Sequence, residues 1–129
     1  MLKKISFKTN KRIEVIDLTN KLNNLNLEGS GILQIFVPHA TAAIILNEAE
    51  KGLMKDFEKW ISSNFQGDWK HDRIDNNASA HLASGLLNQG VTLSVEDGEI
   101  IRGTWQNLLF LELDGPRSRR NIIFHYLKK

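Results

Sequence analysis

The chain has 129 residues and a mass of 14.7 kDa, which is enough for a single domain with a buried core, so we treat residues 1–129 as one domain. A hydrophobic content of 41% and a charged content of 25% exclude wholesale disorder, and the absence of cysteine excludes disulfides, thiolate metal sites and cysteine nucleophiles. A net charge of +2 and an aromatic content of 8% do not favour nucleic-acid binding. The longest apolar run, Ala42–Leu46, is far too short to span a membrane, and no apolar signal region follows Met1. We therefore expect a cytoplasmic protein without a membrane partner.

Two short alternating runs begin the chain, at residues 5–7 and 13–15, and Asn10-Lys11 between them predicts a hairpin turn. Leucines at helical intervals then predict a short helix within residues 18–25. Thr19 is the expected N-cap of this helix.

Buried strands are predicted at residues 32–37 and 42–46, because both segments are continuous apolar runs. Pro38 ends the first of them, since proline cannot donate to a central ladder. Residues 49–64 give the clearest helical pattern of the chain. Its apolar stripe is formed by Leu53, Phe57, Trp60 and Ile61.

The polar stretch from residue 66 to residue 77 is typical of a long functional loop. A short helix over residues 78–87 follows, with Asn77 as its expected cap, and Asp97-Gly98 predicts a type I′ hairpin turn. Further strands are expected at residues 91–95, 99–101, 108–113 and 121–127. In total we predict an α+β fold with mostly antiparallel sheets, about seven or eight strands arranged like a sandwich, and two or three helices.

Three of the four histidines, His39, His71 and His81, lie at the ends of predicted elements in polar surroundings. If these neutral imidazoles met, they would form an open metal site, or they could serve as acid, base and anion donors. Alternatively, they are unrelated surface histidines. His125 lies within the last strand, and we interpret it as structural.

Asn47 and Glu48 lie where a strand ends and the long helix is expected to begin. Glu48 could be a carboxylate base, a metal ligand or a first-turn acid favoured by the helix dipole, and the sequence favours the last of these. Asn47 could be only the N-cap of the helix.

Arginines cluster after the turn Asp114-Gly115-Pro116, and guanidinium groups on a turn suit a phosphate or a carboxylate. Strand alternation sends Arg119 and Arg120 to opposite faces, so Arg117, Arg119 and Arg120 cannot all bind one anion. The alternative is a solvated edge or a salt bridge between subunits. Trp105 could form the wall of a pocket or could belong to a core or an interface.

Several separated motifs together resemble the YjbQ-like family, often described as secondary thiamine-phosphate synthase. The resemblance covers nearly the whole chain, with two departures: Asp72 stands where the family usually has Asn, and Asn76 stands where it usually has Gly. The matching segments are Pro38–Ala43, Asn47-Glu48, His71-Asp72, Asn77–Leu82, Gly103–Gln106 and Asp114–Arg117.

The resemblance implies a compact α+β fold, a homotrimer with sites near the subunit boundaries, and a transferase activity. In that reaction a pyrimidine-methyl group passes from its diphosphate to a thiazole phosphate. We expect catalytic roles for His39, His71, His81, Glu48 and Asn77, and binding of an anionic substrate by Thr41, Asn47, Trp105, Arg117 and Arg119. The three histidines could also hold a divalent metal ion, such as zinc, nickel or magnesium, and no organic cofactor is expected. The alternative is a trimeric protein that binds an anionic metabolite or a metal without catalysis.

Overall fold

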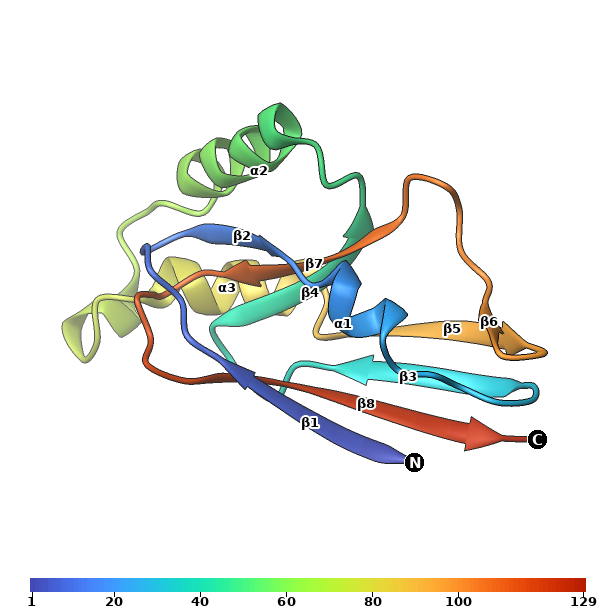
Figure 1. Ribbon diagram of the computed structural model, residues 1–129. Coiled ribbons are helices and arrows are strands. Elements are labelled where there is room, and N and C mark those ends of the chain that lie inside the picture. The colour runs from blue at the N-terminus through green and yellow to red at the C-terminus, as the bar shows by residue number, and fades with distance from the viewer.

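The computed structural model describes residues 1–129 as two stacked antiparallel sheets with helices on one side (Figure 1). The five-stranded sheet, in spatial order, contains β1 (Leu2–Phe7), β8 (Arg120–Lys128), β3 (Gly31–Phe36), β5 (Gly90–Glu96) and β6 (Glu99–Ile100). The three-stranded sheet contains β2 (Glu14–Asp17), β7 (Asn107–Glu112) and β4 (Ala42–Asn47). The helices are α1 (Thr19–Asn23), α2 (Lys51–Asn64), α3 (Ala78–Leu87) and the 3-10 helix η1 (Lys70–Arg73). The predicted α+β class and its antiparallel sheets are thus confirmed.

Strand β7 explains how the layers are held together, because both of its faces are buried. Leu108 and Phe110 face the five-stranded sheet and belong to the larger core cluster. Leu109 and Leu111 point the other way, into a second cluster with Ile61 of α2 and with α3. A strand covered on both faces reads as a continuous apolar run, which is the pattern of residues 108–111.

The outer face of the five-stranded sheet is covered by no other element of the chain. On β3, Leu33 and Ile35 are buried, whereas Ile32 and Phe36 keep 44% and 41% of their surface exposed. Leu127 of β8 has 61% exposure on the same face. The apolar run of residues 32–37 therefore forms a strand with one open face, not the fully buried strand that we expected.

The expected hairpin between the first two strands is wrong. β1 pairs with β8 in one sheet and β2 pairs with β7 in the other, so the chain crosses between layers at residues 8–13. The hairpin at Asp97-Gly98 is confirmed: Glu96 pairs with Glu99, and both turn residues have positive φ, at 49° and 81°.

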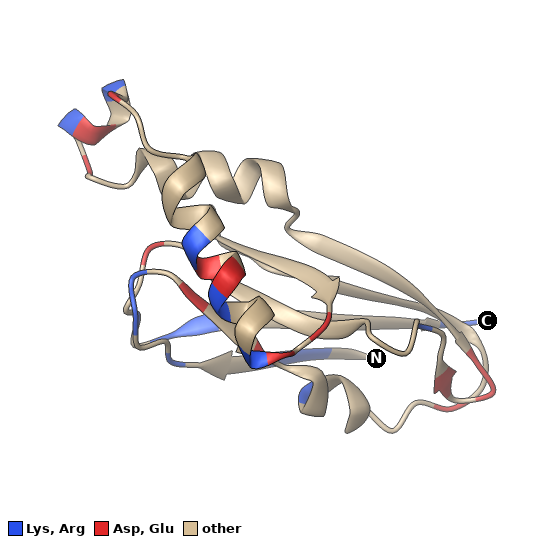
Figure 2. Cartoon of the chain, turned by 90° about the horizontal axis from the view of Figure 1, so that it is seen from above, with Lys and Arg blue, Asp and Glu red and all other residues tan.

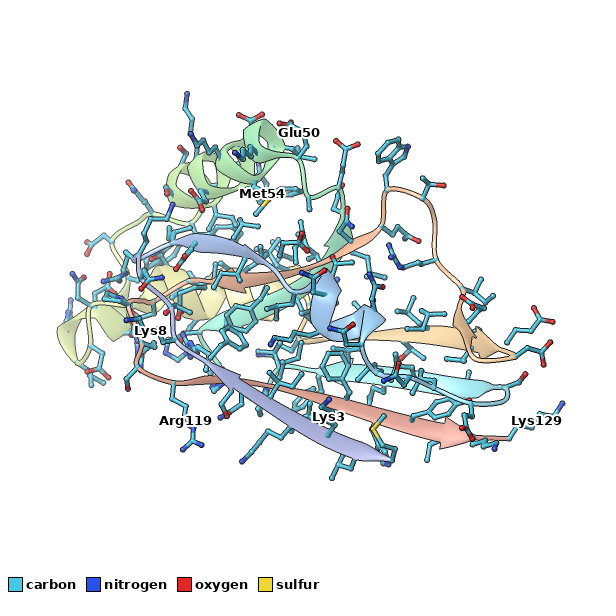
Figure 3. All side chains as sticks on the ribbon, viewed as in Figure 1. Lys3, Lys8, Glu50, Met54, Arg119 and Lys129 are labelled. Carbon is cyan, nitrogen blue, oxygen red and sulfur yellow. The ribbon has the colours of Figure 1, made fainter.

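α2 begins two residues later than expected and is capped by another side chain, whereas α1 begins one residue earlier, at Thr19 itself. α2 starts at Lys51, and the carboxylate of Glu50 accepts the backbone N–H groups of Gly52 and Leu53 (Figure 3). Asn47 is therefore not the cap, and Glu48 is not in the first turn. Thr19 is the first residue of α1 rather than its cap, and its N–H donates to Asp17.

The buried side of α2 differs from the predicted apolar stripe. Ile61 is buried, and the side chain of Met54 on the underside of α2 packs against the smaller core cluster, but Trp60 remains 48% exposed. Most charged residues of the helix lie on its outward side (Figure 2), but Glu58 turns inward and accepts the backbone N–H of Val15 in β2. None of the helices is long and apolar enough to cross a bilayer.

Candidate functional site

The rings of His71 and His81 pack against each other, with centroids 4.8 Å apart and planes at 80°. His71 comes from η1 and His81 from the first turns of α3. The Nε2 atom of His71 is buried without a hydrogen-bond partner, and so is the Oδ1 atom of Asn77 at the start of α3. Buried polar atoms normally find a partner, so these two unpaired atoms point to a ligand that completes the site.

The loop that carries His71 is held by the start of α3. Asp72 Oδ1 accepts the backbone N–H of Ala78 at 2.9 Å, which satisfies one of the free donors of the helix. The side chain of Asn77 makes no capping bond; its Nδ2 donates to Asp114 Oδ2 at 2.8 Å instead. The predicted cap at Asn77 is therefore replaced by Asp72, and Asn77 links α3 to the turn after β7.

A fully buried ion pair lies nearby, between Glu112 of β7 and Arg120 of β8. Arg120 also donates to the backbone and side-chain oxygens of Thr41, both at 3.0 Å. Glu112 further accepts the hydroxyl of Thr9 at 2.7 Å and the N–H of Asp114 at 3.1 Å. Burial raises the pKa of Glu112, but these hydrogen bonds, led by that from Arg120, outweigh burial and leave the pKa below its ordinary value. The pair joins the two sheets within an otherwise apolar layer.

His39 lies beside this pair. Its Nε2 accepts the backbone N–H of Asn121 at 2.8 Å, so the proton of the neutral ring is on Nδ1. Burial and the positive charge of Arg120 lower the pKa of His39 below its ordinary value. His39 is therefore a neutral imidazole that can donate from Nδ1, and neither ring nitrogen is free to ligate a metal while Nε2 accepts from Asn121.

The expected split between Arg119 and Arg120 is confirmed. Arg120 points into the layer between the sheets, whereas Arg119 is exposed and points away from the protein (Figure 3). Arg117 is exposed on the turn and bonds Asp114 through Nη2 at 2.9 Å. Arg12, which the sequence analysis did not single out, lies 3.5 Å from the same carboxylate and lines a hollow with Arg117 and Asn77.

Three expected site residues, Asn47, Glu48 and Trp105, lie at the end of β4 and β7 that is farther from Thr41 and Glu112. Ala42 pairs with Glu112 and Asn47 pairs with Asn107, so the length of β4 separates Glu48 from Thr41. Five residues of strand correspond to about 17 Å. Trp105 is 68% exposed in the loop just before β7, at the same far end as Asn47. Within one subunit, Asn47, Glu48 and Trp105 do not meet the histidines.

No group of three or more His, Asp or Glu side chains in the chain is arranged to hold a metal ion. His71 and His81 meet, but His39 does not complete a three-histidine cluster with them within a single subunit. A shared three-histidine site would therefore need a second copy of the chain.

Glu112, Asp114 and Arg12 are the residues that sequence reasoning missed. The sequence did contain a signal for Glu112. Glu112 follows the core residues Leu108 and Phe110 at intervals of two, and Arg120 precedes the core residues Ile122 and Phe124 at the same interval. Two opposite charges at inward positions of two strands predict a buried pair. No sequence signal marked Arg12, which is brought to the site by folding of the loop between β1 and β2.

Comparison with known proteins agrees with this architecture. Residues 3–129 match the family described as UPF0047 protein YjbQ-like. A UPF0047 protein of Archaeoglobus fulgidus is 41% identical over 121 residues, covering 92% of this chain and 96% of the relative. The UPF0047 protein YugU of Bacillus subtilis is 37% identical over 126 residues, covering 92% and 94% of the two chains.

Solved structures show the same fold. The crystal structure of a YbjQ-like protein of unknown function from Sulfolobus solfataricus P2 has a TM-score of 0.92 at 38% identity and covers 100% of this chain and 97% of that one. A hypothetical protein from Aeropyrum pernix K1 has a TM-score of 0.91 at 37% identity, covering 100% and 99%. By sequence over nearly its full length, and by its fold, the chain belongs to the YjbQ-like UPF0047 family.

Proposed function

We propose that the chain is a small cytoplasmic enzyme that binds a phosphorylated or otherwise anionic substrate beside His71 and His81. The observation that carries this proposal is the unpaired, buried Nε2 of His71, on a ring that packs against the ring of His81. A desolvated imidazole without a partner costs stability, and such a cost is typical of functional sites.

The arginines around the turn after β7 support an anionic substrate. Asp114 is shared between the guanidinium groups of Arg12 and Arg117, and Asp75 adds a second carboxylate to the hollow, so the support comes from the arginine donors and not from a net positive charge. Both arginines line the same hollow as Asn77, a few residues before His81. A phosphate or diphosphate in that hollow would meet arginine donors of the kind that suit its geometry.

The specific reaction that we propose is the transferase reaction implied by the family resemblance. The bond between the pyrimidine-methyl carbon and the diphosphate oxygen breaks, and its electron pair leaves on the diphosphate. The thiazole nitrogen then forms the new carbon–nitrogen bond with its lone pair. Arg117 would bind the departing diphosphate, Arg119 lies exposed on the same turn, and His39 would donate a hydrogen bond from Nδ1 without adding charge.

A divalent cation such as zinc, nickel or magnesium fits the site in part. His71 Nε2 is free to ligate, and His81 is in contact with it, so the two imidazoles offer two nitrogen ligands. When bound, the cation would neutralise charge on a phosphorylated substrate. The remaining positions would belong to water, substrate or a second subunit.

A homotrimer is the second part of the proposal, because one subunit keeps its candidate residues apart. Asn47, Glu48 and Trp105 lie at the far end of β4 and β7, and a neighbouring copy could bring them to the histidines. The open face of the five-stranded sheet offers large exposed apolar side chains for such an assembly.

The test is an assay of the purified protein with the pyrimidine-methyl diphosphate and the thiazole phosphate. We expect turnover that falls about 100-fold in His71→Ala and His81→Ala. Lys21→Gln is the control, since Lys21 is exposed on α1, outside both the histidine pair and the open sheet face. Absence of turnover, or an unchanged rate in His81→Ala, would contradict the proposed enzyme.

The alternative is a non-catalytic protein that binds an anionic metabolite or a metal. It is favoured by the observation that one chain supplies only two adjacent histidines and no third ligand. Saturable binding of phosphorylated ligands without turnover, lost in Arg117→Gln, would establish the alternative.

A further inference from the structure

A second hollow lies away from the histidine pair, between α2, α3 and the loop before β2. Its volume is about 290 Å³, close to the lower end of the range for small-molecule pockets. Its lining combines an apolar floor with a polar rim, and it consists of Arg12, Ile13, Ile61, Ser62, Phe65, Gln66, Ser79, Ala80, Ala83 and Leu113.

The floor is apolar and firmly packed. Ile61, Ala80 and Ala83 are 4%, 2% and 1% exposed, and all three belong to the smaller core cluster. The two alanines leave space where larger side chains of α3 would fill the gap. An engineered apolar cavity of about 150 Å³ binds benzene, so this hollow has room for a ring and a short side chain.

The rim carries polar groups that the fold does not use. The side chains of Gln66 and Ser79 make no hydrogen bond within the chain, although both line the hollow. Arg12 is 53% exposed, and its Nε lies 3.5 Å from Asp114, whereas Arg117 approaches the same carboxylate to 2.9 Å. The guanidinium of Arg12 also donates from Nη2 to the backbone carbonyl of Asn76 at 2.8 Å, so its remaining N–H groups are the ones that could meet an anion in the hollow.

We propose that this hollow binds a small amphiphilic carboxylate, with its apolar body against Ile61, Ala80 and Ala83 and its carboxylate at Arg12. Gln66 and Ser79 supply further donors at the rim. The site contains neither His71 nor His81, although it shares Arg12 with the hollow beside Asn77, and the proposal does not depend on the proposed function.

The experiment is a titration of the full chain with 3-phenylpropionate, followed by NMR shifts of the alanine methyl groups. We expect saturable binding that moves the methyl signals of Ala80 and Ala83. The alcohol 3-phenylpropanol has the same apolar body without the charge, and we expect it to bind at least fivefold more weakly. Arg12→Gln should weaken the carboxylate about fivefold and leave the alcohol unchanged, and Lys21→Gln on the distant α1 should change neither.

A matched pair of serines tests the location. Ser62 and Ser63 are neighbours in α2, and each donates to the backbone carbonyl four residues earlier, but only Ser62 lines the hollow. Ser62→Leu should weaken binding at least tenfold, and Ser63→Leu should leave it unchanged. Ser79→Leu fills the same space from α3 and gives a second test if Ser62→Leu fails to fold. Absence of binding, or equal effects of the two α2 variants, would overturn the proposal.

Discussion

At the scale of single residues, the Glu112–Arg120 pair dominates the candidate site. Its charges are fully removed from water, so each requires the other and the surrounding hydrogen bonds. The pair fixes Thr41, and the charge of Arg120 adds to burial in lowering the pKa of His39, whereas Glu112 acts against that shift.

Glu112→Gln should destabilise the protein by about 3 kcal/mol, because it leaves the Arg120 charge buried without a counter-charge. Urea denaturation gives the free energy of unfolding. The control is Lys11→Met, which breaks the exposed pair between Lys11 and Glu58 and should cost about 1 kcal/mol or less. Similar losses in both variants would contradict the assigned role of the buried pair.

The lowered pKa of His39 predicts a specific pH dependence. The unfolded chain takes up a proton near the ordinary pKa of 6.5, whereas the folded chain resists protonation until a lower pH. The contribution of His39 to stability is therefore complete above pH 6.5 and is lost as the pH falls through the folded-state pKa.

Denaturation curves between pH 7.5 and pH 5 should show this decline, and His39→Gln should flatten it, since glutamine does not titrate. The Glu112 pKa is also lowered, but its ordinary value is 4.5, so the loss that it causes begins at lower pH. A wild-type stability that rises as the pH falls from 6.5 would rule out the assigned state of His39.

At the scale of elements, α3 is held by contacts from other parts of the chain. Asp72 caps its first turn from the preceding loop, Asn77 anchors it to Asp114, and Ser84 donates to the carbonyl of Ala42 at 2.7 Å. The helix and the loop with His71 therefore form one unit, and the geometry of the His71–His81 pair depends on these anchors.

Asp72→Ala should destabilise the protein by about 1 kcal/mol and increase amide exchange at residues 78–81, because a free N–H of the helix loses its acceptor. Asp72→Asn should have a smaller effect, since its amide oxygen also accepts a hydrogen bond. Asp75→Ala is the control, because Asp75 is exposed and its side chain caps nothing. Equal exchange in Asp72→Ala and in Asp75→Ala would disprove the cap.

At the scale of the whole molecule, the layers are asymmetric. Helices cover one face of the three-stranded sheet, whereas the five-stranded sheet presents Ile32, Phe36 and Leu127 to solvent (Figure 1). These side chains lie on the same face as the exposed polar residues Gln34, Thr92, Ser94 and His125, and a mixed face with large exposed apolar side chains suits contact with another molecule. We expect a second and a third copy of this chain to cover it.

Light scattering across protein concentration should give the mass of a trimer, about three times the 14.7 kDa of one chain. Phe36→Lys should shift the mass toward the monomer, because it places a charge in the open face. Leu86→Lys is the control, since Leu86 is 70% exposed on α3, away from that face. A folded, active monomer in the wild type would contradict the assembly.

The sequence by itself determined the features that depend on neighbouring residues. Alternation assigned Arg119 and Arg120 to opposite faces, Asp97-Gly98 specified its turn, and the pattern of residues 49–64 specified the long helix, which forms over Lys51–Asn64. These features follow from the period of a strand, the φ preferences of a turn and the period of a helix, all of which act over a few residues. The separated motifs also indicated the family correctly, and with it the α+β fold.

Only the tertiary structure decided which distant segments meet. The spacing of the first two strands favoured a hairpin, but burying apolar side chains on both faces of β7 required β2 in one sheet and β1 in the other. The same packing brought His71 to His81, Arg120 to Glu112 and Arg12 to Asp114, and it left Glu48 at the far end of β4. Local sequence patterns do not predict these contacts, because the two residues of a contact are separated by between 8 and more than 100 positions in the chain. Such contacts form only where the buried surface offsets the entropy lost when the segments come together.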